Sequence, residues 1–254
     1  MPRHVEAWMD GVALHSVGPV MIQQVYEDPP QMEIVTGERP GRPGERLIAT
    51  TRKGLRVAIE VVIRELFDLR ARTRTQEKLA AWATGRYLML SNHYGRRLKV
   101  TCTGMPTLGS ARDYTSALRL EFTAHDVPYW EDAAQTTMSL SGGAQSGRLF
   151  VPGTAPAPVC IVVEPMSGAL TTFAASVAGQ RIALSGLSVP QGGRLLFERD
   201  RWDDLAITQG GVSLLRRRSA QSADDLIAAP GRADVSFEAD TDCSVRFGVR
   251  GRWA

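Results

Sequence analysis

Hydrophobic and polar residues alternate along several short stretches of this chain, and the alternation predicts a protein built mainly of β-strands. The clearest example runs from Leu55 to Val61, where apolar residues at every second position are separated by Arg56 and Glu60. A similar pattern spans Ala117 to Thr123. Because successive side chains of a strand point to opposite faces, each pattern places one face of a strand on a core.

Further strands are predicted in both halves of the chain, and turn dipeptides such as Ala178-Gly179 and Pro230-Gly231 separate several of them. Many short strands with a turn signal every 8–12 residues or so are typical of an antiparallel β-sandwich or jelly roll. The additional expected strands are 5–9, 20–26, 87–90 and 98–103 in the first half, and 159–163, 170–177, 181–184, 195–199, 212–215, 235–238 and 245–252 in the second.

One helix is predicted, over about 74–84. Thr73 and Gln76 have the spacing of a capping box at its start. An apolar face that includes Trp82 runs along it, and Gly85 follows at a position where a left-handed backbone is common. A single amphipathic helix cannot form a bundle, so we expect it to lie across a sheet.

A boundary between two domains is predicted near the middle of the chain. The strand that ends at Thr123 runs into a corner with Pro128, which has no backbone donor for a sheet ladder. The stretch Ser141–Gly147 is too rich in Gly and Ser for a core element and is interpreted as a linker. The expected domains are 1–133 and 134–254. In the first, the Pro- and Gly-rich stretch 38–45 is predicted to be an exposed loop.

Composition excludes several classes of protein. The 254 residues are 43% hydrophobic and carry a formal net charge of +3, too weak a basic balance to predict nucleic-acid binding. No apolar run approaches the roughly 18–20 residues of a membrane span, and the N-terminus has no secretory pattern, so we expect synthesis and folding in a cytoplasm. The three cysteines are interpreted as small buried hydrophobes, not as a disulfide framework.

Catalytic and metal-binding patterns are missing from the sequence. No Gly-x-Ser-x-Gly elbow occurs, and the stretch from Gly142 to Arg148 lacks the Lys and Ser/Thr of a phosphate-binding loop. The carboxylate pairs Asp203-Asp204 and Asp224-Asp225 are interpreted as solvated turns. We therefore expect no enzyme activity, cofactor or metal. The four histidines have no partner at metal-ligand spacing: His4, His15, His93 and His125.

Several features occur in one order along nearly the whole chain. They are an opening strand with a turn at 9–12, the loop 40–44, the strand 57–62, the helix with Trp82, the stretches 87–90 and 94–96, the corner 126–129, the Gly-Thr-x-x-x-Pro segment 153–158, and a Pro-Gly turn at 230–231. This ordered set resembles the distal tail protein (Dit) family of long-tailed phages. The family pattern has an Asn after the Pro-Gly turn, which is absent here.

The resemblance implies an N-terminal split-barrel-like β domain with one helix and a C-terminal galectin-like antiparallel β-sandwich. It also implies a structural role at the virion tail tip, as a homo-hexameric ring that joins the tail tube protein to a tail-associated hub protein and to receptor-binding proteins. DNA would pass through the lumen of the ring without specific binding. The expected ring contacts are Glu38, Arg39, Arg42, Glu45, Tyr94, Arg96 and Arg97.

Other functions stay open from the sequence. A carbohydrate-binding two-domain β module would use Trp202 as a contact to a sugar, and the same residue is a candidate contact to a partner protein. A tail-associated glycosidase would use a pair of Asp or Glu residues across a cleft. A tail-tube subunit of similar fold would form long tubes in place of single rings.

Overall fold

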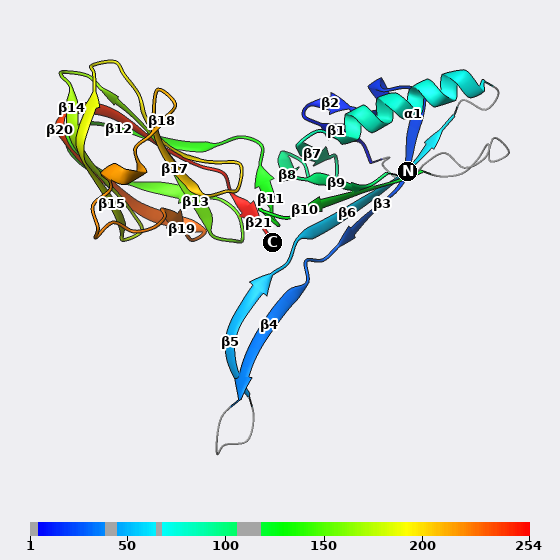
Figure 1. The fold of residues 1–254 in the computed structure, drawn as a ribbon, viewed down its shortest axis with the longest axis horizontal. Coiled ribbons are helices and arrows are strands. Elements are labelled where there is room, and N and C mark those ends of the chain that lie inside the picture. Colours follow the sequence, from blue (N-terminus) through cyan, green and yellow to red (C-terminus); the bar gives the residue numbers. More distant parts are fainter. Residues whose placement is uncertain (1–4, 39–44, 65–67, 106–117) are drawn as a thin grey trace. The chain divides into compact units, whose positions relative to one another are not determined.

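The computed structural model describes residues 5–38, 45–64, 68–105 and 118–254. Its contacts divide the chain into two compact units, Met1–Trp130 and Glu131–Ala254. Both units are built mainly of antiparallel strands, and the described residues contain one α-helix, in the first unit (Figure 1). The expected fold class, mainly β with two β-rich units, is confirmed. The domain boundary after residue 133 stays a prediction.

The first unit contains two antiparallel sheets. In one, β6 (Leu55–Ile63) lies between β3 (Val20–Asp28) and β10 (Leu118–Ala124), and β9 (Thr101–Gly104) pairs with β10. The alternation that predicted β6 places Val57, Ile59 and Val61 in the core, each at most 1% exposed. The other sheet includes, in order, β2 (Val12–Ala13), β1 (Ala7–Met9), β7 (Tyr87–Leu90) and β8 (Arg96–Lys99), and a short 3-10 helix, η1 (Leu14–Ser16), follows β2.

Helix α1 (Leu69–Ala83) begins earlier than predicted, and its cap is Asp68. The Asp68 Oδ1 accepts hydrogen bonds from the backbone N–H groups of Arg70 and Ala71, at 2.9 and 3.1 Å. The capping box at Thr73 was therefore wrong, because a carboxylate five residues upstream already satisfies the first N–H groups. The expectation that the helix packs on a sheet is confirmed, since Trp82 meets the ring of Phe122 edge-on at 6.4 Å.

Gly85 follows the helix for a steric reason and not for the predicted left-handed backbone. It is absent from the residues with positive φ. A Cβ at this position would lie 2.2 Å from Met9 Cγ, so only glycine allows the close approach. Asp10 completes the junction, because its carboxylate accepts the backbone N–H groups of Arg86 and Tyr87 at 2.8 and 2.9 Å.

A two-stranded ribbon continues from the first unit beyond β3 and β6 (Figure 1). It consists of β4 (Met32–Glu38) and β5 (Glu45–Arg52), which pair with each other and with no other described strand. We call this ribbon the arm. The sequence analysis predicted an exposed connection over 38–45, but it did not predict the two strands that flank it.

The second unit is an antiparallel β-sandwich dominated by two long strands. β12 (Thr136–Val151) and β20 (Gly231–Val249) pair over almost their whole lengths, and β20 pairs on its other side with β13 (Ala157–Pro165) and β14 (Leu170–Val177). The remaining elements are β11 (Trp130–Asp132), at the junction of the units, β15 (Gln180–Val189), β16 (Leu195–Arg199), β17 (Leu205–Gln209), β18 (Val212–Ser213), the 3-10 helix η2 (Leu215–Arg217), β19 (Ile227–Ala228) and β21 (Arg252–Trp253).

The predicted linker Ser141–Gly147 was wrong, because it lies inside β12. Ser141 pairs with Ser244 and Gly147 pairs with Val235, with a shift of register between Gly142 and Ala144. Glycine weakens a strand, but it is tolerated at a bulge, and Gly142 has a φ of +130° that other residues rarely adopt. The predicted strands 235–238 and 245–252 likewise belong mostly to one long strand, β20.

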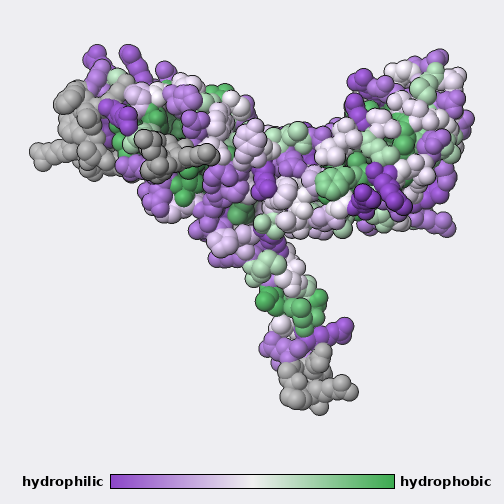
Figure 2. Space-filling view, turned by 180° about the vertical axis from the view of Figure 1, so that it is seen from behind, coloured by the Kyte–Doolittle hydropathy of each residue, from purple (hydrophilic) through white to green (hydrophobic). Residues whose placement is uncertain are grey.

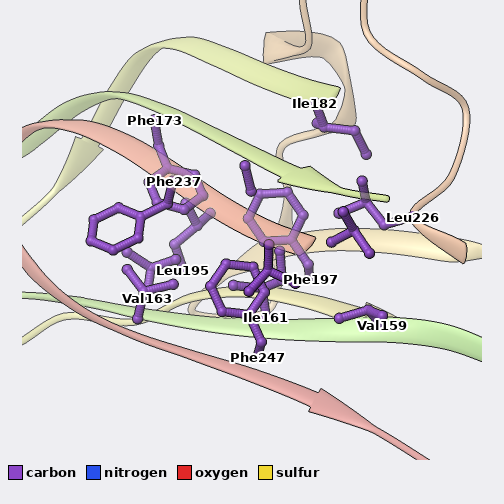
Figure 3. Close-up of a cluster of buried hydrophobic side chains, with 14 of the residues drawn as sticks. Val159, Ile161, Val163, Phe173, Ile182, Leu195, Phe197, Leu226, Phe237 and Phe247 are labelled. Carbon is purple, nitrogen blue, oxygen red and sulfur yellow. The ribbon is translucent and has the colours of Figure 1, made fainter. Parts of the chain in front are cut away.

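The core of the second unit is aromatic and aliphatic. Phe173 lies 5.7 Å from Phe197 and 6.2 Å from Phe237, measured between ring centroids. Figure 3 shows side chains from strands on two sides of the sandwich meeting in this cluster. All of these rings are at most 2% exposed, so the unit buries a continuous core of its own.

The cysteines and the helices bear on the predictions that were made from composition. All three cysteines are free thiols, with Cys243 buried and Cys102 and Cys160 half-buried. Burial raises the pKa of the Cys243 thiol to about 11, so it is inert at neutral pH. Among the described helices, none combines the length and the apolar character that a membrane span requires.

Candidate assembly interface

The arm exposes large apolar side chains to solvent. Five of them, between 43 and 63% exposed, are Met32, Ile34, Val35, Leu47 and Ile48. Figure 2 shows the hydrophobic residues of the arm on its surface. Single exposed apolar residues are normal on a protein, but a cluster on one small element marks an interaction site.

The pairing of the two strands distributes these side chains over both faces of the arm. Ile34 is paired with Thr50, and Thr36 is paired with Leu47. Because paired residues share a face and faces alternate along a strand, Ile34 and Leu47 lie on one face and Val35 on the other. The Ile48 side chain packs over Gly37, because a Cβ added at Gly37 would lie 2.8 Å from Ile48 Cδ1. Ile48 therefore lies on the same face of the arm as Val35. Each face is therefore partly apolar.

Two of the predicted contact residues lie opposite each other on the arm. Glu38 ends β4, Glu45 begins β5, and the two are directly paired. Like charges at opposed positions destabilise a strand pair. A partner that brings a cation to this end of the arm would relieve the repulsion. The predicted contacts Arg39 and Arg42 lie outside the described residues.

The turn between β7 and β8 presents the predicted residue Tyr94, which is 94% exposed. The backbone N–H of Arg96 donates to the carbonyl of His93 at 3.0 Å, and Gly95 adopts a φ of +72° that closes the turn. A large aromatic side chain fully in solvent, on a turn of fixed shape, is suited to contact another molecule.

A cluster of four side chains anchors this turn. The ring of His93 stacks on Trp130, with centroids 4.1 Å apart, and the His93 Nε2 lies 2.8 and 2.9 Å from the two carboxylate oxygens of Glu27. Asn92 donates a further hydrogen bond to Glu27 at 3.1 Å. Burial alone would raise the pKa of Glu27, but the hydrogen bonds and charge of His93 outweigh it, with support from Asn92 and Trp130, and the pKa is lowered.

The other two predicted residues of this turn are less exposed than Tyr94. Arg96 and Arg97 are both half-buried at the start of β8. The guanidinium carbon of Arg97 lies 4.0 Å from the centroid of the Tyr87 ring, so this side chain is held by a cation–π contact. The structure therefore groups Tyr94, Arg96 and Arg97 in one turn, and Glu38 and Glu45 on the arm.

Trp202, in the second unit, is 58% exposed. It sits in the turn between β16 and β17, where Asp200 Oδ1 accepts the N–H groups of Trp202 and Asp204 at 2.7 and 3.0 Å. The guanidinium carbon of Arg201 lies 4.7 Å from the centroid of the Trp202 ring. The ring is therefore available to a ligand or a partner, with one face already contacted.

One carboxylate of each pair considered for a glycosidase is held in an ion pair and only partly exposed, so the prediction of solvated turns was wrong for Asp203 and Asp225. Asp203 Oδ2 accepts from Arg252 at 2.5 Å, and Asp225 forms an ion pair with Arg199. Arg252 also contacts Glu131 at 3.4 Å, and all these residues are at least half-buried. In the part of the chain that the structure describes, no group of three or more His, Cys, Asp or Glu residues is placed to hold a metal ion.

Sequence reasoning missed the apolar residues of the arm. A signal was available, because Met32, Ile34 and Leu47 flank the Pro- and Gly-rich stretch at spacings that suit two strands of a hairpin. The polar loop drew the prediction instead. Polar residues mark where a loop is exposed, whereas exposed apolar residues mark where a partner binds.

Comparisons with known proteins find the same fold in phage tail proteins. No protein-family model matches the chain, and no curated protein matches it. Among solved structures, the crystal structure of the SPP1 Dit protein, described as a paradigm of the hub adsorption apparatus in phages that infect Gram-positive hosts, covers 96% of this chain and 98% of its own, with a TM-score of 0.69 and 14% identity.

Two structures of the phage p2 baseplate in its activated conformation are also similar. The strontium-containing structure covers 97% of both chains with a TM-score of 0.54 and 9% identity. The calcium-containing structure covers 99% of this chain and 98% of its own, with a TM-score of 0.52 and 10% identity. The resemblance stated from the sequence is confirmed in the fold: over nearly its whole length, this chain has the fold of a phage Dit protein.

Proposed function

We propose that this chain is the structural distal tail protein of a long-tailed phage or prophage. Six copies form a ring at the virion tail tip, and the ring joins the tail tube protein to a tail-associated hub protein and to receptor-binding proteins. The observation that carries the proposal is the arm, whose large apolar side chains are 43 to 63% exposed in the described chain. The shared fold with Dit and baseplate proteins supports it.

An exposed apolar ribbon lowers the stability of an isolated copy of the chain. An isolated two-stranded ribbon is marginally stable in water. Covering the exposed part of five large apolar side chains stabilises by roughly 1 kcal/mol for each. A neighbouring copy is the partner that is always present at equal concentration. Contact between the arm of one copy and the body of the next is heterologous, and such contacts close into a ring when the rotation between copies allows it.

The predicted contact residues have distinct roles in this ring. Glu38 and Glu45 form an acidic pair on the arm that a cation of the neighbouring copy neutralises. Tyr94 supplies an exposed aromatic anchor, and Arg96 and Arg97 provide the basic surroundings of the same turn. The second unit, a galectin-like sandwich by the resemblance, carries attachment surfaces for the distal proteins. DNA passes through the lumen without specific binding, and the role is structural, not enzymatic.

Light scattering of the purified protein tests the ring. We expect a mass of about six times the 27.7 kDa of one chain, and closed rings in negative-stain images. The double variant Ile34→Asp with Leu47→Asp places charges on one face of the arm and is expected to give monomers. The matched control is Val212→Asp, which changes an apolar residue in the second unit that is 66% exposed, and it is expected to keep the large mass.

A monomer at high protein concentration, or a large mass that survives the two arm substitutions, would contradict this proposal. Long tubes in place of single rings would identify a tail-tube subunit instead. The comparison of masses is valid only if the unfolding curves of the variants match that of the unsubstituted protein, because a variant that fails to fold does not report on assembly.

The second candidate function is carbohydrate binding by the second unit, and the exposure of Trp202 is the observation that favours it. A sugar ring would stack on the indole, and nearby polar groups would bind its hydroxyls. Glycan binding by the arm double variant, lost on Trp202→Ala, would support this function without a ring. Turnover of a polysaccharide, lost on changing one carboxylate, would be required for a glycosidase.

A further inference from the structure

One edge of β12 is open along its whole length. Its 16 residues pair with β20 on one side, and no other described strand pairs with β12. Among the described residues, none of the backbone hydrogen bonds outside the regular ladders involves 136–151 either. The outward N–H and C=O groups of this strand are therefore available to a further strand.

Other edges of the second unit are protected. β15 is a terminal strand of its sheet, but the backbone N–H groups of Ser219 and Ala223 donate to the carbonyls of Ala183 and Arg181, at 2.9 and 2.8 Å. The Ser222 hydroxyl accepts the N–H of Ala183 at 3.0 Å. β18, at the other end of the strand order, is two residues long. Covering an edge and shortening it are both ways to prevent strand addition.

β12 is neither covered nor short, and its one irregularity, the shift of register between Gly142 and Ala144, lies beyond the stretch 137–141. It contains no proline, lysine or carboxylate, and its single charge is Arg148, which forms an exposed ion pair with Asp234 on β20 at 3.3 Å. Edge strands that must stay unpaired usually carry charges or proline. The composition of this edge therefore favours pairing.

The first half of β12 has a pattern that reads the same in both directions around Ser139. Half-buried Met138 and Leu140 flank it, and exposed Thr137 and Ser141 come next. A second copy of this strand, antiparallel and centred on Ser139, would place Met138 opposite Leu140 on the core side. It would place Thr137 opposite Ser141 on the outer side, with no charges opposed.

We propose that this edge pairs with the same edge of a second copy of the chain, about a two-fold axis at Ser139. Such a contact is isologous and self-complementary, and it extends each sheet across the axis. The added strand would also cover Met138 and Leu140, which pack at the border of the core and are not fully buried. The proposal does not depend on the ring of arms.

The contact is expected to be weak for single copies. A short ladder must outweigh the loss of translational and rotational freedom on association. Copies that are already joined through their arms would bind each other through several such edges at once, which strengthens the association without any new contact. Pairing should therefore be tested by trapping it covalently.

Cysteine scanning tests both the contact and its register. In Ser139→Cys the two new cysteines would face each other across the axis. Opposed residues of antiparallel strands have Cα atoms about 4.5–5.5 Å apart, which suits a disulfide. We expect Ser139→Cys to form covalent dimers under mild oxidation, seen on a non-reducing gel and lost on reduction.

The neighbouring positions supply matched controls. In the proposed pair, position 137 of one copy lies opposite position 141 of the other. In each single variant, Thr137→Cys or Ser141→Cys, the two new cysteines therefore lie about 13 Å apart along the strands and should not cross-link. The double variant Thr137→Cys with Ser141→Cys should cross-link again. The unsubstituted protein measures the background from its three native thiols.

Cross-linking of Ser139→Cys no stronger than that of Ser141→Cys, or than the background, would overturn the proposal. A strand of another protein on this edge would give that result. The same cross-link should form in the arm double variant Ile34→Asp with Leu47→Asp, and its loss there would also count against an independent contact. Ser139 is exposed, so unchanged unfolding of Ser139→Cys is expected to confirm that the fold is intact.

Discussion

The two units of this chain differ in how completely they bury their apolar residues. In the second unit, aromatic and aliphatic side chains from most of the strands form one continuous buried cluster. In the first unit, the sheet around β6 is buried, while the arm that continues from it leaves five large apolar side chains in solvent. The same alternation of residues builds both regions. What differs is whether the chain supplies the surface that covers them, and the arm points to a partner because it does not.

The largest expected effect is the difference in unfolding free energy between a substitution in the core of the second unit and one on the arm. Phe237→Ala in the second unit should lower the free energy of unfolding by about 3–5 kcal/mol, because it leaves a cavity beside Phe173. Ile34→Ala on the arm removes an apolar side chain that is 62% exposed, and in the unassembled protein it should cost well under about 1 kcal/mol. Urea unfolding followed by circular dichroism measures both.

Equal costs for these two substitutions would remove the contrast between the units. The cost of Ile34→Ala should be measured by adding it to Leu47→Asp at low protein concentration, because assembly does not contribute to stability under these conditions. In the assembled protein the cost of Ile34→Ala should rise, since the same side chain is then buried.

An intermediate effect concerns ion pairs within the second unit. Arg252→Ala would leave Glu131 and Asp203 without their shared cation in a place where the Glu131 and Arg252 side chains are 12 and 11% exposed, and should cost about 3 kcal/mol. Arg148→Ala breaks a pair whose side chains are 71 and 86% exposed, and should cost less than about 0.5 kcal/mol. A similar cost for both variants, from denaturant unfolding, would show that burial does not set the strength of these pairs.

The smallest expected effect is the loss of stability of the first unit at acidic pH. Because the pKa of Glu27 is below the ordinary value of 4.5, this carboxylate stabilises the fold above that value, and the contribution is lost as pH falls through the lowered pKa. Glu27→Gln should cost about 1 kcal/mol at neutral pH, since the Glu27 side chain is 26% exposed and keeps part of its hydration, and should flatten the loss of stability in acid. Unfolding midpoints between pH 6 and pH 3 measure it, and an unchanged acid slope in the variant would contradict the assignment.

Many strand positions along the chain could be predicted from sequence because buried strands carry clear alternation. Three strands have the bounds that the pattern predicted: Tyr87–Leu90, Leu170–Val177 and Leu195–Arg199. In each, short apolar runs end at residues that favour turns or loops. Where a local pattern and the tertiary structure agree, sequence alone is sufficient.

The failures have physical causes of two kinds. The glycine-rich part of β12 was taken for a linker because its pairing with β20 overrides the low strand propensity of Gly and Ser. The start of α1 was misplaced because the carboxylate of Asp68 competes with Thr73 for the capping role, and sequence spacing favoured the threonine. In both cases the deciding partner is not apparent from local sequence.

The predicted ring contacts differ in how they are held. Tyr94 is 94% exposed, whereas Arg97 is held by Tyr87, which no spacing in the sequence indicates. The apolar arm was missed because the Pro- and Gly-rich stretch 38–45 drew the prediction and the two strands that flank it were not predicted. The sequence could have indicated a hairpin there, but the exposure of its apolar residues is known only from the fold.

The two glycines in the middle of β12 set which side chains of that strand reach the interior. Before them, the core-facing positions are the even-numbered Met138 and Leu140, and after them they are the odd-numbered Leu149 and Val151. The register shift at this point absorbs the change of parity. A strand without the extra residue Gly143 would alternate without interruption and keep the same side chains on the core face, so that residue and the shift of register depend on each other. Natural length variation at this point should therefore remove the glycine and the shift of register together.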